Sequence, residues 1–508
     1  MASSNVHHLH FVLFPLMAQG HSIPMLYIAK LLVNQAAPLS ITIQITILTT
    51  PQNASHLQIS HYPQIHIALL HPSLPISHKT FDQLTSLNQS LSFFSSIAHD
   101  FHSQALSLCQ SLSPKPSCII SDICLPWTLH IASHIGVPWI SFSGGSCFAN
   151  VVMTNVMTAF GSGSGSENID ESIEVFGLEH RIEFTTKAQL PIQGVLSGGM
   201  MKFLEQIGEA EKKAYGMIVN SFEELEGSYV THLKKKVRGN RVWCVGPVSS
   251  CNKHYVDKAQ RGKGSTKEGQ DNNNNNDKVM KWLDLQDPNS VLYVCLGSLH
   301  NLKTPQLIEL GLGLESSKRP FIWVVRASNK LQKWIEEENF EERIKTRGLV
   351  IRDWAPQLLI LSHFAIGGFL THCGWNSVLE AISAGLPMLT WPLFSDQFLN
   401  EKLVADVLDI AVKVGAKNPV MKMKEEEQED QKEEEEEEEE GIIIEVKKED
   451  VREGIERVMG KGDEAEERRK KAREFGVMAN NAWEEGGSSQ LNIRLLIDDI
   501  MKQTKIST

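Results

Sequence analysis

The sequence lacks the marks of several common protein classes. Its eight cysteines are scattered with no C-x-x-C pair, so neither a disulfide framework nor a cysteine-based zinc site is indicated. No apolar run reaches the roughly 18 residues that a membrane-spanning helix needs. The first apolar run, residues 11–18, has no Lys or Arg before it and is broken by Pro15, so it is a poor signal peptide. These absences predict a cytoplasmic chain without a transmembrane segment.

An excess of one charge is also missing once a single segment is set aside. The net charge is −12, and residues 425–440 alone carry 13 acidic residues and one lysine, which accounts for all of it. Like charges at this density repel one another and stay solvated, so residues 421–441 are predicted to be a disordered acidic loop. The remainder is neutral and shows no basic stripe, which argues against a nucleic-acid partner.

The length indicates more than one domain, because 508 residues exceed what one hydrophobic core usually holds. A Gly-, Ser-, Lys- and Asn-rich stretch with five consecutive asparagines separates two patterned halves. We therefore predict an N-terminal domain at 1–248, a linker at 249–278 and a C-terminal domain at 279–482. Regular structure is expected to resume at Trp282. Residues 483–508 are expected to form a C-terminal helix that packs back on the N-terminal domain.

Both halves alternate between strand and helix patterns. Apolar or alternating strands are predicted at 9–16, 41–47, 118–121, 139–142, 291–296, 321–325, 349–352, 367–371 and 388–391. Helices are predicted from Pro24 onward and at 126–135, 304–315, 376–384, 449–459, 465–481 and 491–501. Such repeats imply an α/β fold with two parallel sheets, each covered by helices on both faces. Ligands bind at the carboxyl ends of such strands, so two facing sheets would form a cleft that takes one ligand from each side.

The strongest candidate site is the turn after the strand at 367–371. Here the sequence Thr-His-Cys-Gly-Trp-Asn-Ser-Val-Leu-Glu, residues 371–380, leads through Gly374 directly into a helix. The first N–H groups of a helix lack partners and carry the positive end of its dipole, which suits a diphosphate. His372, Asn376 and Ser377 would add donors. These ten residues alone also fit an ordinary capped helix.

The surroundings of this turn decide between the two interpretations. Residues 354–397, 44 in all, resemble the signature box of the plant secondary-product UDP-glycosyltransferases without a gap. Segments 220–226, 242–248, 282–287 and 291–298 resemble the same family. Residues 306–326 and 485–489 resemble its branch acting on triterpenoids, steroids and flavonoids. The resemblance implies two facing Rossmann-like domains (the GT-B fold) with a cleft between them, the acceptor side being N-terminal and the donor side C-terminal.

On the donor side, the resemblance implies a role for each matching residue. Trp354 would stack on the uracil, because an aromatic face suits a flat base, although it could also be a core residue. Glu380 would accept hydrogen bonds from the ribose hydroxyls, although it could also be a solvated helix residue. The other implied contacts are Ala355 and Gln357 near the base, Ser298, His372, Asn376 and Ser377 at the diphosphate, and Trp375, Asp396 and Gln397 at the sugar. The resemblance also implies that glutamine at position 397 goes with glucose as the sugar of the donor.

On the acceptor side, the resemblance identifies His21 as the catalytic base and Asp122 as its partner. A neutral imidazole can take the proton from an acceptor hydroxyl as that oxygen attacks the sugar. Asp122 would orient the ring and stabilise the imidazolium. One of 19 histidines at a helix start could instead be structural.

No Asp-x-Asp pair occurs, so we expect a metal-independent reaction without a cofactor, in which the helix N-terminus and His372 stabilise the leaving UDP. Direct attack implies inversion at the anomeric carbon. The predicted protein is thus a hexosyltransferase, expected to be a monomer, that moves glucose from UDP-glucose to a hydroxyl of a small lipophilic plant metabolite. The alternatives are another UDP-sugar donor, an already glycosylated acceptor or, remotely, an interaction protein acting through the acidic tract. A nicotinamide-dependent reductase would need a G-x-G-x-x-G motif, which is absent.

Departures from the family pattern lie on the acceptor side. Ser22 stands where the family usually has an apolar residue, and the Gly, Cys and Glu-Asn pattern of related members is missing around residues 69–83. The acidic run also replaces a short loop that often begins with Trp-Gly. The acceptor is therefore predicted only as a class.

Overall fold

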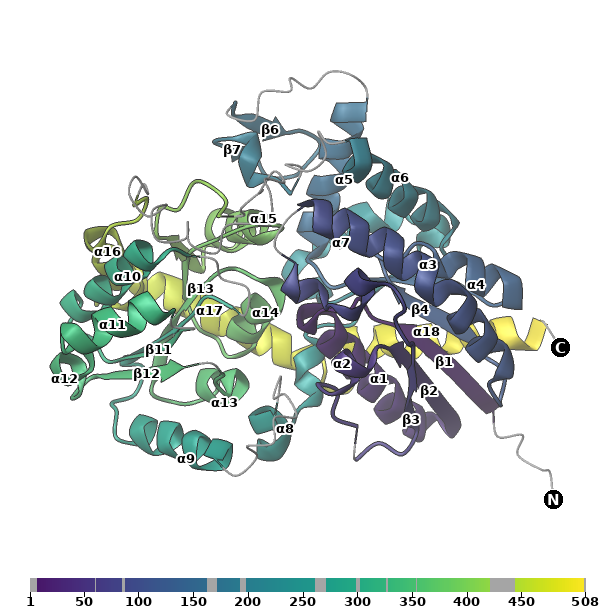
Figure 1. Cartoon of the computed structure of the whole chain (residues 1–508), viewed down its shortest axis with the longest axis horizontal. Coiled ribbons are helices and arrows are strands. Elements are labelled where there is room, and N and C mark those ends of the chain that lie inside the picture. The colour runs from purple at the N-terminus through teal and green to yellow at the C-terminus, as the bar shows by residue number, and fades with distance from the viewer. Residues whose placement is uncertain are drawn as a thin grey trace.

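The computed structural model describes residues 7–59, 61–84, 87–161, 171–191, 198–260, 271–297, 302–325, 328–352, 354–420 and 444–506. Two α/β units lie side by side, the N-terminal one in purple and blue and the C-terminal one mostly in green (Figure 1). Each unit is built around one parallel sheet. The two-domain α/β fold predicted from the strand and helix patterns is confirmed.

The N-terminal sheet has seven strands in the order β3-β2-β1-β4-β5-β8-β9. All its neighbours pair in parallel, and β1 lies between β2 and β4. The chain order reverses between β1 and β4, and ligands bind at such switch points in open sheets. The strands are β1 His7–Phe14, β2 Ile41–Thr49, β3 Ile65–Leu69, β4 Cys118–Asp122, β5 Trp139–Ser143, β8 Gly216–Val219 and β9 Val242–Cys244.

The C-terminal sheet has six parallel strands in the order β12-β11-β10-β13-β14-β15. Its switch point lies between β10 and β13, the counterparts of β1 and β4. The strands are β10 Val291–Cys295, β11 Phe321–Val325, β12 Gly348–Arg352, β13 Ile366–Thr371, β14 Met388–Thr390 and β15 Ala411–Lys413. A separate hairpin, β6 Ile173–Val175 with β7 Ile182–Phe184, projects at the top of Figure 1.

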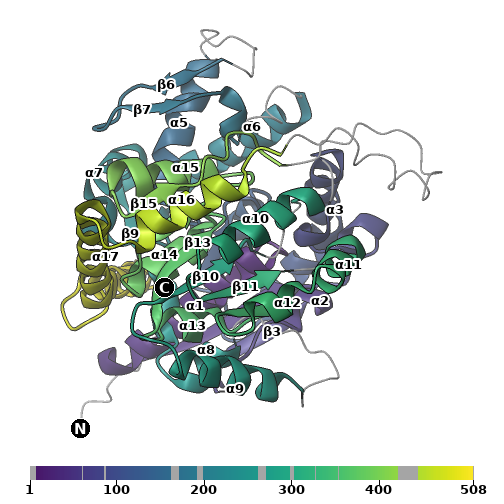
Figure 2. The ribbon, with the colours of Figure 1, turned by 90° about the vertical axis from the view of Figure 1, so that its left-hand side faces the viewer.

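Helices cover both faces of each sheet, so the central strands are apolar on both sides. In β1, Phe11 and Leu13 pack with α1, whereas Val12 and Phe14 pack with α3 and α4. Figure 2 shows α10 and α16 lying over the C-terminal sheet. The N-terminal helices are α1 Gln19–Ala36, α2 Pro51–Ala54, α3 Leu87–Ser111, α4 Thr128–Ile135, α5 Cys147–Gly161, α6 Gly198–Lys213 and α7 Glu223–Lys236. The later ones are α8 Tyr255–Gln260, α9 Asp271–Asp284, α10 Thr304–Ser316, α11 Asn329–Glu337, α12 Phe340–Ile344, α13 Gln357–Leu361, α14 Trp375–Ser383, α15 Gln397–Lys402, α16 Lys448–Met459 and α17 Asp463–Asn481.

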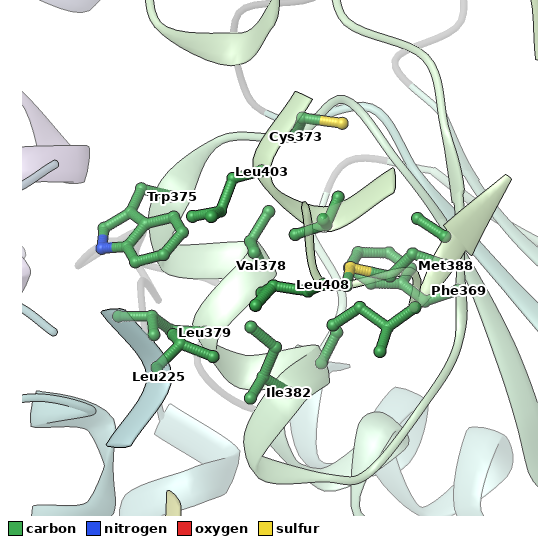
Figure 3. Close-up of a cluster of buried hydrophobic side chains, with 14 of the residues drawn as sticks. Leu225, Phe369, Cys373, Trp375, Val378, Leu379, Ile382, Met388, Leu403 and Leu408 are labelled. Atoms are coloured by element: carbon green, nitrogen blue, oxygen red, sulfur yellow. The ribbon is translucent and has the colours of Figure 1, made fainter. Parts of the chain in front are cut away.

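One cluster of buried hydrophobic side chains extends across both domains. Leu225 of α7 lies beside Leu379 of α14 in Figure 3, and Trp375 packs in the same cluster. That cluster joins α5 and α7 of the first domain to α14 and the β13–β14 region of the second. Apolar contact of this kind fixes how the two sheet edges face one another.

The last helix, α18 Ser488–Ile506, returns to the N-terminal domain. Figure 1 shows this yellow segment passing from the C-terminal domain toward the N-terminal one. Ile493, Leu496, Ile497 and Ile500 are fully buried in the cluster that also holds Phe11 and Leu13. Trp483, just before α18, donates its indole N–H to the carbonyl of Pro247 at 3.1 Å.

Two boundary predictions were wrong. Helix α1 begins at Gln19 rather than near Pro24, so Pro24 lies inside the helix, where its ring and missing N–H leave the Gly20 carbonyl without an intrahelical partner. Helix α9 begins at Asp271, within the predicted linker, so regular structure does not wait for Trp282. Val279 and Leu283 of α9 are buried in the core, and this tertiary packing outweighs the low helix propensity of asparagine. The predicted acidic loop 421–441 lies outside the described residues.

No helix among the described residues is long and apolar enough to cross a bilayer.

Candidate active site

His21 and Asp122 meet at the switch point of the N-terminal sheet. His21 lies in the first turn of α1, just after β1, and Asp122 is the last residue of the neighbouring β4. The His21 Nδ1 and the Asp122 Oδ2 are 2.7 Å apart, and the Asp122 side chain is fully buried. The other carboxylate oxygen of Asp122 accepts the Cys124 N–H at 3.0 Å. Because a carboxylate can only accept, Nδ1 carries the hydrogen and Nε2 keeps its lone pair.

The surroundings of His21 favour its protonated form more than water does. Burial by itself lowers the pKa of His21, but the Asp122 carboxylate, through its charge and hydrogen bond, outweighs that effect. The charges of Asp82 and Asp396 act in the same direction, so the pKa of His21 is raised above its ordinary value. The ring can therefore accept a proton readily.

The predicted diphosphate turn, residues 371–377, follows β13 at the switch point of the other sheet. Two glycines make room there for the ring of His372. A Cβ on Gly374 would lie 2.5 Å from His372 Nε2, and one on Gly297 would lie 2.6 Å from it. Gly297 also has a φ of +80°, a conformation that side chains disfavour. The helix start and the imidazole thus present donors at one place.

One cavity of about 680 Å³ brings the two switch points together. Its size is in the range of small-ligand sites. Residues of both domains line it. Among the predicted residues, the cavity wall includes His21, Trp354, Ala355, Gln357, His372, Trp375, Asn376, Ser377, Asp396 and Gln397.

The start of α14 is also hydrogen-bonded across the domain interface. Asn376 donates its side-chain amide to the carbonyl of Gly20 at 2.8 Å. That carbonyl is four residues before Pro24, which has no N–H to offer it within α1. The proline therefore leaves an acceptor open for the other domain. The side chain of Asn376 is thus engaged in an interdomain contact as well as lining the cavity.

The indole of Trp375 packs between the two domains. It is 4% exposed and donates to the carbonyl of Asn220 at 2.6 Å, inside the shared core. Figure 3 shows the ring among apolar side chains such as Leu379 and Leu403. Trp375 also lines the cavity, so its predicted contact with the sugar stays a prediction, while its large apolar ring gains from burial between the domains.

Glu380 and Ser298 were also predicted at the donor site. Glu380 is 3% exposed and is not on the cavity wall, but its carboxylate accepts the Gln357 amide at 2.8 Å. Gln357 lines the cavity and also donates to Ser377 at 3.1 Å. Glu380 therefore helps to orient Gln357 and, through it, Ser377. Ser298 lies outside the described residues.

Asp396 and Gln397 are held at the start of α15. The Gln397 side-chain oxygen accepts the N–H groups of Leu393 and Phe394 at 2.8 and 3.2 Å, which leaves its amide nitrogen as the donor group. Asn400, fully buried, donates to Asp396 at 3.0 Å and to the Cys373 carbonyl at 3.0 Å. Burial raises the pKa of Asp396, and the Asn400 hydrogen bond opposes that effect. Asp396 and the turn at residues 371–377 are thereby linked through Asn400.

Asp82 and Asn220 were not predicted from the sequence. Asp82 lines the cavity and influences the His21 charge, but it follows β3 in a stretch without periodic pattern. Asn220 lies in the 220–226 segment, whose family resemblance was the available signal. Among the described residues, no three His, Cys, Asp or Glu side chains are grouped so as to hold a metal ion. The metal-independent mechanism remains a prediction.

Comparisons with known proteins agree with this geometry. The family model described as UDP-glucoronosyl and UDP-glucosyl transferase matches residues 269–422. The chain is 45% identical to UDP-glycosyltransferase 73C6 of Arabidopsis thaliana and 44% identical to UDP-glycosyltransferase 73C25 of Barbarea vulgaris, over 97% of each chain in both cases. Among solved structures it is similar to Glycyrrhiza uralensis UGT73P12 complexed with glycyrrhetinic acid 3-O-monoglucuronide. That match has a TM-score of 0.81 and 32% identity, and covers 98% of this chain and 97% of the other.

Proposed function

This chain belongs to the plant family 1 UDP-glycosyltransferases, and on that premise we propose that it moves glucose from UDP-glucose to a hydroxyl of a lipophilic plant metabolite, with His21 as general base. One observation carries the proposal. His21, whose Nδ1 is held by the buried Asp122, lines the same cavity as the turn at residues 372–377. Direct displacement requires a general base and a binding site for the UDP-sugar within the same cavity.

The proposed step needs no covalent intermediate. Nε2 of His21 takes the proton from the acceptor hydroxyl while that oxygen forms a bond to the anomeric carbon. The bond between that carbon and the β-phosphate oxygen breaks, and its electron pair leaves with UDP. The imidazolium that forms is stabilised by Asp122 at 2.7 Å. Attack from the face opposite the leaving group inverts the anomeric configuration.

Hydrogen-bond donors at the start of α14 lie where we propose that the leaving diphosphate binds. The first N–H groups of α14 and the His372 ring face the cavity at the turn. Such donors are in place before the reaction, so they stabilise the charge that develops on UDP without reorganisation. Trp354, Ala355 and Gln357 are the residues we propose around the uracil, and Asp396 and Gln397 those around the sugar.

A lipophilic acceptor suits the wall nearest His21. Phe81 lines the cavity and packs against Phe93 and Phe94, with ring centroids 6.0 and 5.3 Å apart. Ile23 lines the same side. We propose a triterpenoid, steroid or flavonoid, and the bound compound in the Glycyrrhiza uralensis relative supports testing acceptors that already carry a sugar.

In a donor panel with UDP-glucose, UDP-galactose and UDP-glucuronic acid, we expect UDP-glucose to give the highest kcat/KM by about tenfold. The reason is that one well-oriented hydrogen bond to a sugar hydroxyl is worth about 1 kcal/mol or more. The Gln397 amide supplies such a donor in a fixed orientation. Products from triterpenoid, steroid and flavonoid aglycones and their monoglycosides are measured by mass spectrometry.

The His21→Ala variant serves as the low-turnover control in that panel. A preference for UDP-galactose or UDP-glucuronic acid would reject the glucose assignment. Failure to transfer from any donor to any acceptor of the three classes would reject the acceptor proposal.

A further inference from the structure

A short segment from the loop after β3 is fastened to the start of the helix that carries His21. This segment, η3 Phe81–Gln83, is closed by a hydrogen bond from the Thr80 N–H to the Gln83 side chain at 2.9 Å. Its Phe81 N–H donates to the carbonyl of Met17 at 2.7 Å. Its Asp82 carboxylate accepts the N–H of Gln19 at 2.8 Å. The segment just before His21 is therefore hydrogen-bonded to η3 at two residues, Met17 and Gln19.

Helix α1 has no N-cap side chain of its own. The N-cap residue is Ala18, which cannot accept a hydrogen bond through its side chain. The N-terminal N–H groups of a helix need an acceptor, and short polar side chains usually provide it from the N-cap position. Asp82 provides it here from 63 residues further along the chain.

His21 is the third residue of α1, where the helix dipole is positive and opposes an added positive charge. An imidazolium at this place needs compensating negative charge. Three carboxylates from three elements face it: Asp122 of β4, Asp82 of η3 and Asp396 before α15. The other titratable groups on the wall of the same cavity are His56, Tyr293, Cys295 and His372.

Only one of these carboxylates both acts on the charge of His21 and caps its helix. We propose that Asp82 is a positioning residue for the transfer reaction, which fixes the first turn of α1 so that His21 Nε2 points into the cavity and places a second negative charge beside the ring. The inference rests on the proposed role of His21 as base. It does not require Asp82 to touch either substrate.

The variant Asp82→Asn separates the charge from the cap, because asparagine can still accept the Gln19 N–H. The base must be neutral to act, so turnover is lost as the pH falls through the pKa of His21. Removing a negative neighbour lowers the pKa of His21, so the acid limb of the kcat profile should move to lower pH. A weaker base should also lower kcat on the plateau by about three- to tenfold, with the KM for UDP-glucose unchanged.

Two further variants complete the series. Asp82→Ala should shift the acid limb in the same way and also lower the Tm, because the Gln19 N–H loses its acceptor. Asp82→Glu should restore the wild-type pH profile. The His21 ring is also titrated directly by NMR with labelled histidine, its signal being assigned by its loss in His21→Gln, which gives a reading independent of turnover.

Asp100→Asn is the matched control. Asp100 is a buried carboxylate that holds the same loop by accepting the N–H groups of Ser73 and Leu74, both at 2.9 Å. The carboxylates that raise the pKa of His21 are Asp122, Asp82 and Asp396, and Asp100 is not among them. Asp100→Asn should therefore lower the Tm and leave the acid limb in place.

An unshifted acid limb and unchanged kcat in Asp82→Asn would overturn the inference. An equal shift in Asp100→Asn would do the same, because it would assign the effect to loop packing. Full activity of His21→Gln would instead overturn the proposed function, so the two failures are distinguishable.

Discussion

Replacing His21 with alanine is expected to lower kcat/KM by about two to four orders of magnitude without unfolding the protein. The variant removes the group that we propose takes the acceptor proton, while the proposed donor contacts from the other domain stay intact. The His21 side chain is one-third exposed, so its loss leaves no large cavity in the core. Initial rates with UDP-glucose, UDP affinity by calorimetry and the Tm separate these effects.

Asp122→Ala should lower turnover by a similar factor, because the ring loses the partner that fixes its tautomer. The matched control is His130→Ala, since His130 is exposed on α4 of the same domain. Near-wild-type turnover in His21→Ala would reject the base assignment. An equal loss in the His130 control would show that the assay reports general damage to this domain.

Gly374→Ala is expected to lower kcat/KM by about 100-fold and to weaken UDP binding measurably. The Gly374 backbone has a φ of −60°, which any residue adopts, so close approach is the reason for glycine here. The added Cβ would lie 2.5 Å from His372 Nε2 and would force the ring away from the helix start. Calorimetry with UDP checks the binding directly.

Gly208→Ala serves as its control, because Gly208 is inside α6 and nothing lies within 4 Å of an added Cβ. It should retain activity and keep or slightly raise the Tm. If Gly374→Ala bound UDP as tightly as the wild type, the turn could not be the diphosphate grip that we propose.

Periodicity and strand-end reasoning predicted the elements that build the two switch points. The apolar runs became β1, β4, β10 and β13, and a ligand cleft was expected at their carboxyl ends. The pairing of His21 with Asp122 was implied by the family resemblance, and the two side chains lie 2.7 Å apart. The first residue of helix α1 could not be predicted from periodicity. The proline suggested a later start, whereas the freed Gly20 carbonyl finds its partner in Asn376, 356 residues away.

Long-range packing explains the remaining misses. Asp82 lies in a segment without repeat pattern, and its proposed role depends on a hydrogen bond to Gln19 that no local signal encodes. The burial of the Trp375 ring in the interdomain core depends likewise on Asn220, 155 residues away. Helix α9 forms from poor helix formers because Leu283 is fully buried.

The placement of α18 has a consequence for how the protein is made. A ribosome releases the chain from the N-terminus onward, and domains usually fold as they emerge. Here the side chains that complete the first domain, among them Ile493 and Ile500, are translated only after the whole second domain. One apolar flank of the first domain therefore stays uncovered while the second domain is being made, and it is exposed to aggregation throughout that interval.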